Sequence, residues 1–104
     1  MDAHRAALEE IALHPELLGI KEPILETRLE VPVRNKRGRV LTDIDVLFLT
    51  PSLAYVVEVK TGCRPDFDKA YQQSLKARKY ANRNYPQSAR SMIVWYKDER
   101  IIVI

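Results

Sequence analysis

The feature that most constrains the fold is a short, almost continuous run of apolar residues at 53–60, LAYVVEVK. A strand with one face in water alternates apolar and polar side chains, whereas a strand covered on both faces is apolar at nearly every position. The run therefore predicts a central strand between two layers. Glu58 and Lys60 interrupt it near its end, and they share one side of the strand because successive side chains point to opposite faces.

The segments before and after this run carry their own periodic patterns. Apolar residues at helical spacing predict a helix over 2–18 with Asp2 as its N-cap, ending near Leu13 because Pro15 opens a further short turn. A second helix is predicted over 66–83, with Asp66 or Asp68 as its N-cap. Strand patterns cover 24–33, 39–49, 91–96 and the final residues IIVI.

These elements predict a single α/β domain over 1–104, in the order α-β-β-β-α-β-β. Short turns join the first three strands, which should form an antiparallel meander. The passage from 53–60 through the second helix to 91–96 should be a crossover that leaves those two strands parallel. We therefore expect one mixed sheet with a helix on each face.

Composition excludes several classes of protein. A chain of 104 residues suits one domain with a modest core. No stretch approaches the ~20 consecutive apolar residues that a membrane span needs, so no membrane partner is expected. Cys63 is the only cysteine and cannot form an internal disulfide, which favours a reducing, cytoplasmic setting. The first ten residues lack the pattern of a signal peptide.

Polar residues at the strand ends suggest a reactive centre. Asp43 and Asp45 stand on one side of the strand at 39–49, and either carboxylate could face Glu58 and Lys60 if the two strands pair. Charged groups at the end of an apolar strand are costly to desolvate unless they have partners. An ordinary cross-strand salt bridge between Glu58 and Lys60 is the simpler alternative.

Paired carboxylates facing a cleft are ligands suited to Mg²⁺ or Mn²⁺. Such an ion can activate water and stabilise charge on a phosphoryl group, which are the two requirements of phosphodiester hydrolysis. A neighbouring lysine can hold the attacking water. The backbone carbonyl of Val59, between Glu58 and Lys60, is a candidate for a further metal ligand.

At these residues the sequence resembles the PD-(D/E)xK nucleases, which have a restriction-endonuclease-like core. Asp43-Ile44-Asp45-Val46 and Glu58-Val59-Lys60-Thr61 are similar to the motifs of RecB-like nucleases and archaeal Holliday-junction resolvases, although Ile44 stands where the name-giving motif has proline. The likeness covers roughly residues 5–96. It implies that Asp45 and Glu58 bind the metal and that Lys60 positions the water.

The resemblance extends to two further positions. Many members place a glutamate on the first helix, for which Glu9 and Glu10 are both candidates, with a slight preference for Glu10. RecB-like members have a glutamine on the helix after the ExK motif, often followed by a tyrosine. Gln73 and Tyr80 are the corresponding candidates, and Gln72 is adjacent.

The charge distribution bears on the partner. The net charge is +3, and the basic residues gather in the turn around 34–39 and along the second helix. Such runs can be merely solvated, but here they flank the acidic centre, which favours contact with a phosphate backbone. Arg37, Arg39, Lys76 and Lys79 are the candidate DNA contacts.

The resulting hypothesis is a Mg²⁺- or Mn²⁺-dependent nuclease that cuts DNA, directed by its structure or its ends. The main alternative is a nucleic-acid-binding or assembly module that has the same fold but no turnover. An exposed edge at IIVI could also pair with a second copy, so a homodimer is a further expectation.

Overall fold

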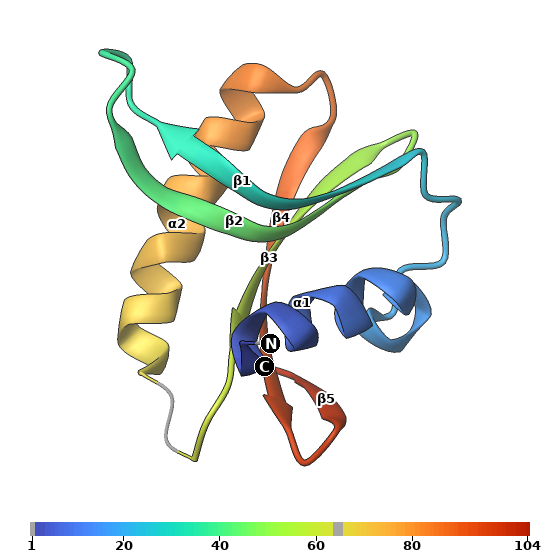
Figure 1. The fold of residues 1–104 in the computed structure, drawn as a ribbon. Helices are drawn as coiled ribbons and strands as arrows, with labels where there is room; N and C mark the ends of the chain where they lie inside the picture. Colours follow the sequence, from blue (N-terminus) through green and yellow to red (C-terminus); the bar gives the residue numbers. More distant parts are fainter. Residues whose placement is uncertain (1, 64–65) are drawn as a thin grey trace.

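The computed structural model describes residues 2–63 and 66–104. Its elements follow the predicted order α-β-β-β-α-β-β, with one short 3₁₀ helix added after the first helix (Figure 1). Their bounds are α1 Ala3–Leu13, η1 Pro15–Leu18, β1 Glu26–Arg34, β2 Val40–Leu49, β3 Leu53–Lys60, α2 Phe67–Asn84, β4 Ser88–Lys97 and β5 Arg100–Val103.

All five strands form one mixed sheet, in the order β1-β2-β3-β4-β5. Neighbouring strands are antiparallel except β3 and β4, which are parallel and are joined through α2 as predicted. β4 begins at Ser88, three residues before the predicted strand. Its first residues pair with β3 through their backbones, but the side chains of Ser88 and Arg90 are exposed and polar, so the apolar pattern does not reveal them. Figure 1 shows α1 on one face of the sheet and α2 on the other.

Both helices begin at an aspartate. The carboxylate of Asp2 accepts a hydrogen bond from the backbone N–H of His4, and that of Asp66 accepts one from Lys69. α1 ends at Leu13, and Pro15 opens η1, because proline is tolerated in the first turn of a helix but not in its interior.

No helix within residues 2–63 and 66–104 is long and apolar enough to cross a membrane.

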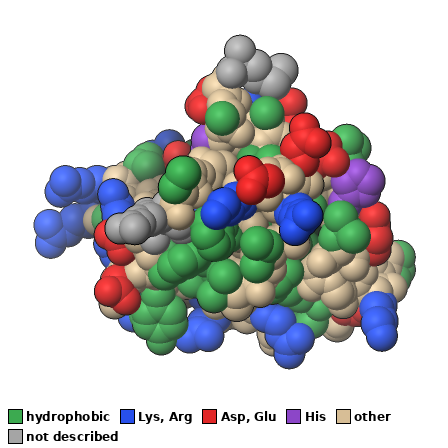
Figure 2. Space-filling model, turned by 90° about the horizontal axis from the view of Figure 1, so that it is seen from below, with side chains coloured by type: hydrophobic (Ala, Val, Ile, Leu, Met, Phe, Trp, Pro, Cys, Tyr) green, Lys and Arg blue, Asp and Glu red, His purple; other side chains and the backbone are tan. Residues whose placement is uncertain are grey.

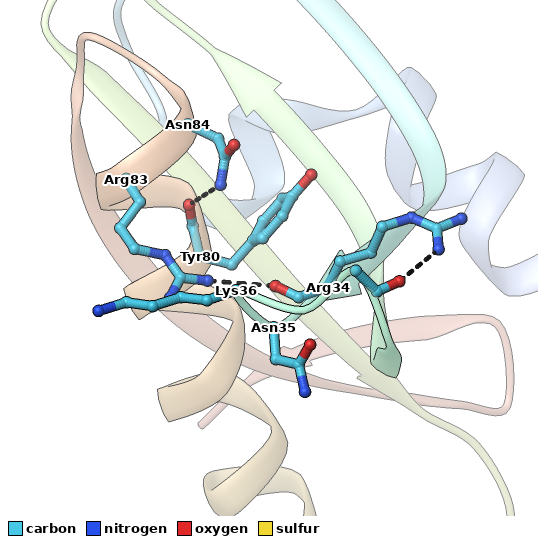
Figure 3. Close-up of a pocket in the computed structure, with 7 residues that line it drawn as sticks. Arg34, Asn35, Lys36, Tyr80, Arg83 and Asn84 are labelled. Atoms are coloured by element: carbon cyan, nitrogen blue, oxygen red, sulfur yellow. Dashed lines mark hydrogen bonds between the residues drawn. The ribbon is translucent and has the colours of Figure 1, made fainter.

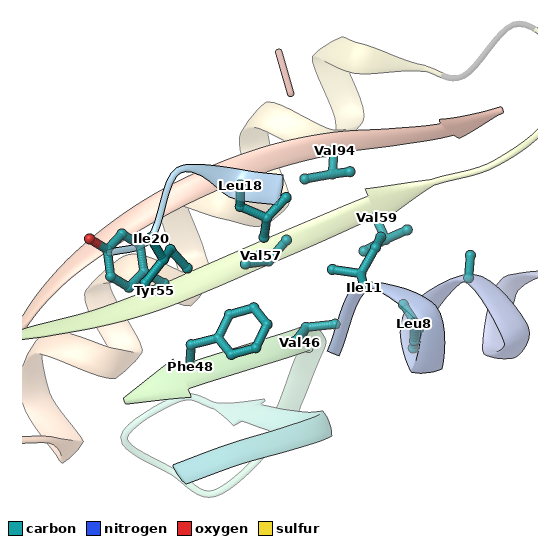
Figure 4. Packing of buried hydrophobic residues seen from close by; sticks show 11 residues of the cluster. Leu8, Ile11, Leu18, Ile20, Val46, Phe48, Tyr55, Val57, Val59 and Val94 are labelled. Atoms are coloured by element: carbon teal, nitrogen blue, oxygen red, sulfur yellow. The ribbon is translucent and has the colours of Figure 1, made fainter. Parts of the chain in front are cut away.

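The two faces of the sheet carry separate cores. On the α1 side, large side chains of α1, η1, β2 and β3 pack together (Figure 4), among them Leu8, Ile11, Phe48 and Val57. On the α2 side, side chains of the sheet pack against alanines of the helix, including Ile44, Leu47, Ala77 and Ala81.

β2 departs from strict alternation. Ile44 and Leu47 both belong to the core on the α2 side, whereas Val46 belongs to the core on the α1 side. Side chains three residues apart on a regular strand point to opposite faces, so the alternation slips by one residue between Ile44 and Leu47. Asp45 lies within this irregular part of β2.

Candidate active site

The site forms where β2 and β3 stop pairing. Their register runs from Leu49 opposite Ala54 to Val46 opposite Val57 and goes no further. The next N–H of β3 that faces β2, that of Val59, donates instead to the carboxylate oxygen Oδ2 of Asp45, at 2.7 Å. The side chain of Asp45 thus replaces a backbone partner, because a buried N–H without an acceptor would be costly.

Glu58 and Lys60 lie beside this carboxylate on the last residues of β3. The side chains of Asp45 and Glu58 are buried, with only 7% and 6% of each residue exposed. The Lys60 ammonium Nζ is 3.7 Å from Oε1 of Glu58. An ordinary ion pair on an exposed face would leave both groups in water, and here the carboxylate is enclosed.

α2 contributes Gln73 to the same site. The amide oxygen of Gln73 accepts a hydrogen bond from Nζ of Lys60 at 3.0 Å, and its amide nitrogen donates to the hydroxyl of Thr42 at 3.4 Å. The glutamine therefore links the end of β3 to β2 and fixes the lysine head group. Four of the predicted residues come together in this way: Asp45, Glu58, Lys60 and Gln73.

Burial sets the protonation of the two carboxyl groups. Desolvation and the negative charge of Asp45 together raise the pKa of Glu58 to about 8, although the Lys60 ammonium opposes both effects. Desolvation also raises the pKa of Asp45, although the hydrogen bond from Val59 and the charge of His4 lower it. Two neighbouring buried carboxyl groups with raised pKa values favour binding of a proton or a cation, because either one reduces their negative charge.

His4 is the residue that sequence reasoning missed. Its Nε2 lies 3.2 Å from the carbonyl oxygen of Val59 and 3.7 Å from Oδ2 of Asp45. His4 and His14 do not have the spacing of a metal-ligand pair, so the sequence alone gives His4 no role. A usable signal was present: His4, Leu8 and Ile11 follow the i, i+4, i+7 spacing of one helix face, and that face packs on the sheet.

The structure does not bring Glu10 to this site. Glu10 is exposed on α1, and its carboxylate is 3.5 Å from the ring of His14. Glu9 is also exposed and pairs with Arg5 at 3.2 Å. Both glutamates lie on the solvent side of α1, because the opposite face, which carries Leu8 and Ile11, packs on the sheet.

The remaining candidates lie outside this cluster of residues. Asp43 is exposed on β2, so Asp45 is the aspartate that the fold brings to Glu58. Arg37 and Arg39 lie exposed in the turn between β1 and β2, and Lys76 and Lys79 are exposed on α2. Viewed from the end of the molecule where β3 ends, acidic and basic side chains surround a central hydrophobic area (Figure 2).

The donor set fits a hard divalent cation, although no ready-made cage is present. Among the described residues, no three His, Cys, Asp or Glu side chains are arranged to hold a metal ion. Some donors are nevertheless close to one another: Nε2 of His4 lies 3.2 Å from the carbonyl oxygen of Val59 and 3.7 Å from Oδ2 of Asp45. The carboxyl group of Asp45 also interacts with that of Glu58. Carboxylate and carbonyl oxygen donors suit Mg²⁺ or Mn²⁺, and a cation would offset the cost of ionising Glu58.

Comparison with known proteins gives no match to a family model, to a curated protein or to a solved structure.

Proposed function

We propose that the protein is a divalent-metal-dependent nuclease that hydrolyses phosphodiester bonds of DNA. The observation that carries this proposal is the enclosure of two carboxyl groups, Asp45 and Glu58, beside a lysine at the end of the central strand. Enclosing two acids raises their pKa values at a cost in stability, and such arrangements cluster at functional sites. The resemblance of these residues to the PD-(D/E)xK motif supports the same conclusion.

Asp45, Glu58 and the carbonyl oxygen of Val59 would hold the metal, with His4 as a fourth donor. A bound Mg²⁺ or Mn²⁺ lowers the pKa of a water and stabilises charge on the phosphoryl oxygens. The hydrogen bond from Val59 to Asp45, at 2.7 Å, fixes the orientation of that carboxylate before any ligand arrives. Preorganisation of this kind spares the site a later reorganisation cost.

Lys60 has the role of orienting the attacking water and stabilising developing negative charge. Its ammonium has three donors, of which one goes to Gln73 at 3.0 Å. The remaining donors face the carboxylate side of the site, where Glu58 lies 3.7 Å away. Gln73 holds the ammonium in place and so acts as a positioning residue.

In this proposal the cut is directed by the shape or ends of DNA, because the lysine and the metal act on the phosphate backbone, whose contacts carry no sequence information. A homodimer is also proposed: Ile102 and Val103 of the edge strand β5 are 39% and 43% exposed, and an exposed apolar edge can pair with a second copy.

The decisive experiment compares wild type with Asp45→Asn on labelled duplex, single-stranded, flap and four-way-junction DNA, each with Mg²⁺ or Mn²⁺. We expect metal-dependent cleavage by wild type and none by the variant. Asparagine keeps an oxygen that can accept the hydrogen bond from Val59, so the fold is retained. The matched control is Asp43→Asn, which removes the exposed aspartate two residues earlier and should cleave like wild type.

Thermal unfolding with and without Mn²⁺ supplies a readout independent of cleavage. We expect Mn²⁺ to raise the unfolding temperature of wild type and of Asp43→Asn, but not of Asp45→Asn. A wild-type protein that binds DNA, cuts none of the four substrates and gains no stability from Mn²⁺ would contradict the proposal. That result would favour a binding or assembly module without turnover.

A further inference from the structure

A basic cavity of about 400 Å³ lies apart from the carboxylates, between the β1–β2 hairpin and the C-terminal part of α2. The hairpin contributes Arg34, Asn35 and Lys36, and the helix contributes Tyr80, Arg83 and Asn84. Figure 3 shows Lys36 and Arg83 extending alongside each other across this junction. Among the described residues that line the cavity none is acidic, so their side chains can offer cationic, amide and hydroxyl donors together.

The hairpin holds its cations in a defined place. The carboxamide oxygen of Asn35 accepts hydrogen bonds from the backbone N–H groups of Arg37 and Arg39, at 2.9 and 3.0 Å. Gly38 has a φ of 83°, a conformation that glycine adopts without strain, and its N–H donates to the carbonyl of Asn35. Lys36 therefore projects from an ordered turn.

The helix side is tied to the hairpin through Arg83. One nitrogen of its guanidinium donates to the carbonyl oxygen of Arg34 at 3.1 Å. A guanidinium has five N–H donors, so this contact leaves most of them for a ligand. Within residues 2–63 and 66–104, none of the ion pairs involves Lys36 or Arg83. The positive charge of the cavity is thus not neutralised by the part of the chain that the structure describes.

A line of basic side chains on α2 connects this cavity with the candidate active site. Lys69, Lys76 and Arg83 recur every seven residues, which places them on nearly the same line along a helix of 3.6 residues per turn. Gln73, which holds Lys60, and Tyr80, which lines the cavity, border the same stripe. Lys79 lies further round the helix, and Lys76 is therefore the better placed of the two predicted lysines.

We propose that this cavity binds one backbone phosphate of the DNA strand that is cut, at a distance from the scissile phosphate beside Lys60. This inference rests on the proposed function, and it adds a fixed distance between two phosphates. The helix residues that line the cavity, Tyr80 and Arg83, lie seven and ten residues beyond Gln73, or about 10 to 15 Å along the helix axis. Phosphates of one strand of duplex DNA advance about 3.4 Å per nucleotide, so a strand that runs along α2 places the bound phosphate about three or four nucleotides from the cut.

A neutral-phosphate scan tests the position. Single methylphosphonate linkages, which lack the charge, are placed one at a time along the cut strand of a duplex. We expect one linkage about three or four nucleotides from the cut to slow cleavage by wild type at least about tenfold, and to leave the rate of Lys36→Gln/Arg83→Gln unaffected. If this linkage slows cleavage by the same factor in wild type and in the double variant, the proposal is wrong.

Binding by a protein that cannot cut separates this inference from the proposed function. The double change Lys36→Gln/Arg83→Gln is made in Asp45→Asn, and duplex affinity is measured against salt concentration. Losing one phosphate contact should reduce the slope of log affinity against log salt by about 0.9. The matched control, Arg90→Gln/Arg100→Gln, removes two exposed cations from β4 and β5 and should leave the slope unchanged.

Each outcome bears on one of the two claims. A reduced slope in a protein whose wild type cuts nothing would support the cavity and contradict the nuclease. If wild type cleaves DNA but the salt slopes of Lys36→Gln/Arg83→Gln and of the control are equal, only the assignment of the cavity to phosphate is contradicted. Duplexes with a 5′-phosphate or a 5′-hydroxyl complete the test: if the variant loses affinity only for the phosphorylated end, the cavity binds a strand terminus and the internal-phosphate assignment is wrong.

Discussion

The two faces of the sheet are built from different kinds of residue. Under α1 the sheet meets large apolar side chains such as Leu8, Ile11 and Phe48. Under α2 the buried helix residues are Ala70, Ser74, Ala77 and Ala81, all of them small. Small side chains let a helix backbone lie close to a sheet, because less side-chain volume separates the two. The α1 face is therefore a conventional core of large apolar side chains. On the α2 face the helix lies close enough to the sheet for its Gln73 to contact Lys60 of β3.

The difference shows how one small domain can hold both a core and a reactive site. The α2 face is apolar over most of its area, from Leu49 and Ala54 at one end to Ala77 on the helix. Only at the far end, where β2 and β3 separate, do Glu58, Lys60 and Gln73 replace apolar side chains. We infer that stability comes mainly from the α1 face, which leaves the α2 face free to carry buried charge.

The largest effect should come from breaking the α1 face. Phe48 is fully buried and is the largest side chain in that state. Phe48→Ala should lower the free energy of unfolding by about 3–5 kcal/mol, from lost apolar burial and the cavity left behind. Asp45→Asn, at the reactive site instead of in this core, should change it by less than about 1 kcal/mol. Urea unfolding of both variants measures the difference, and similar losses in the two would refute this division of roles.

Much of the fold could be predicted because local pattern and burial agree. The apolar run at 53–60 became the central strand, with bounds that the structure confirms. Pro15 and the capping aspartates fixed the helix ends through backbone chemistry that depends on nearby residues alone. Glu58, Lys60 and the two aspartates of β2 were candidates for a related reason, since charged residues stand out within apolar strands. The family resemblance, and not the pattern, favoured Asp45 over Asp43.

The parts that escaped prediction depend on contacts between distant segments. His4 reaches Val59, 55 residues away, and only the packing of α1 on the sheet makes that contact. Glu10 was favoured by family resemblance, but the same packing turns it toward solvent and His14. The cavity at Lys36 and Arg83 also requires the hairpin to meet the end of α2, which a count of charges does not reveal.

A smaller effect should follow from removing buried charge on the α2 face. The pKa of Glu58 is 4.5 when unperturbed and about 8 in the folded protein, so the folded state retains this proton more strongly than the unfolded state. The stabilising proton is fully bound in the folded state below pH 4.5. Its contribution is lost as the pH rises toward 8, because the unfolded state releases the proton first.

Glu58→Gln should therefore flatten the decline in stability between about pH 5 and pH 8. The variant should gain on the order of 2 kcal/mol over wild type at the upper end, since glutamine carries no charge but is still a buried polar group. Urea unfolding of both proteins across this range, without divalent metal, gives the difference. Glu26→Gln, which changes an exposed glutamate, is the control. Parallel curves for wild type and Glu58→Gln would show that Glu58 is ionised in the folded protein.

The smallest effect compares the two helix caps, which are chemically alike but support different faces. Asp2→Ala and Asp66→Ala each remove one hydrogen bond to a helix N-terminus, of 2.9 and 3.0 Å, and should each lower the free energy of unfolding by about 1 kcal/mol. Their effects on metal binding should differ. The cap at Asp2 holds the N–H of His4 itself, so its loss should reduce the stabilisation by Mn²⁺, whereas Asp66→Ala should preserve it. Equal Mn²⁺ stabilisation in both variants would remove His4 from the metal site and leave that site to residues of the sheet alone.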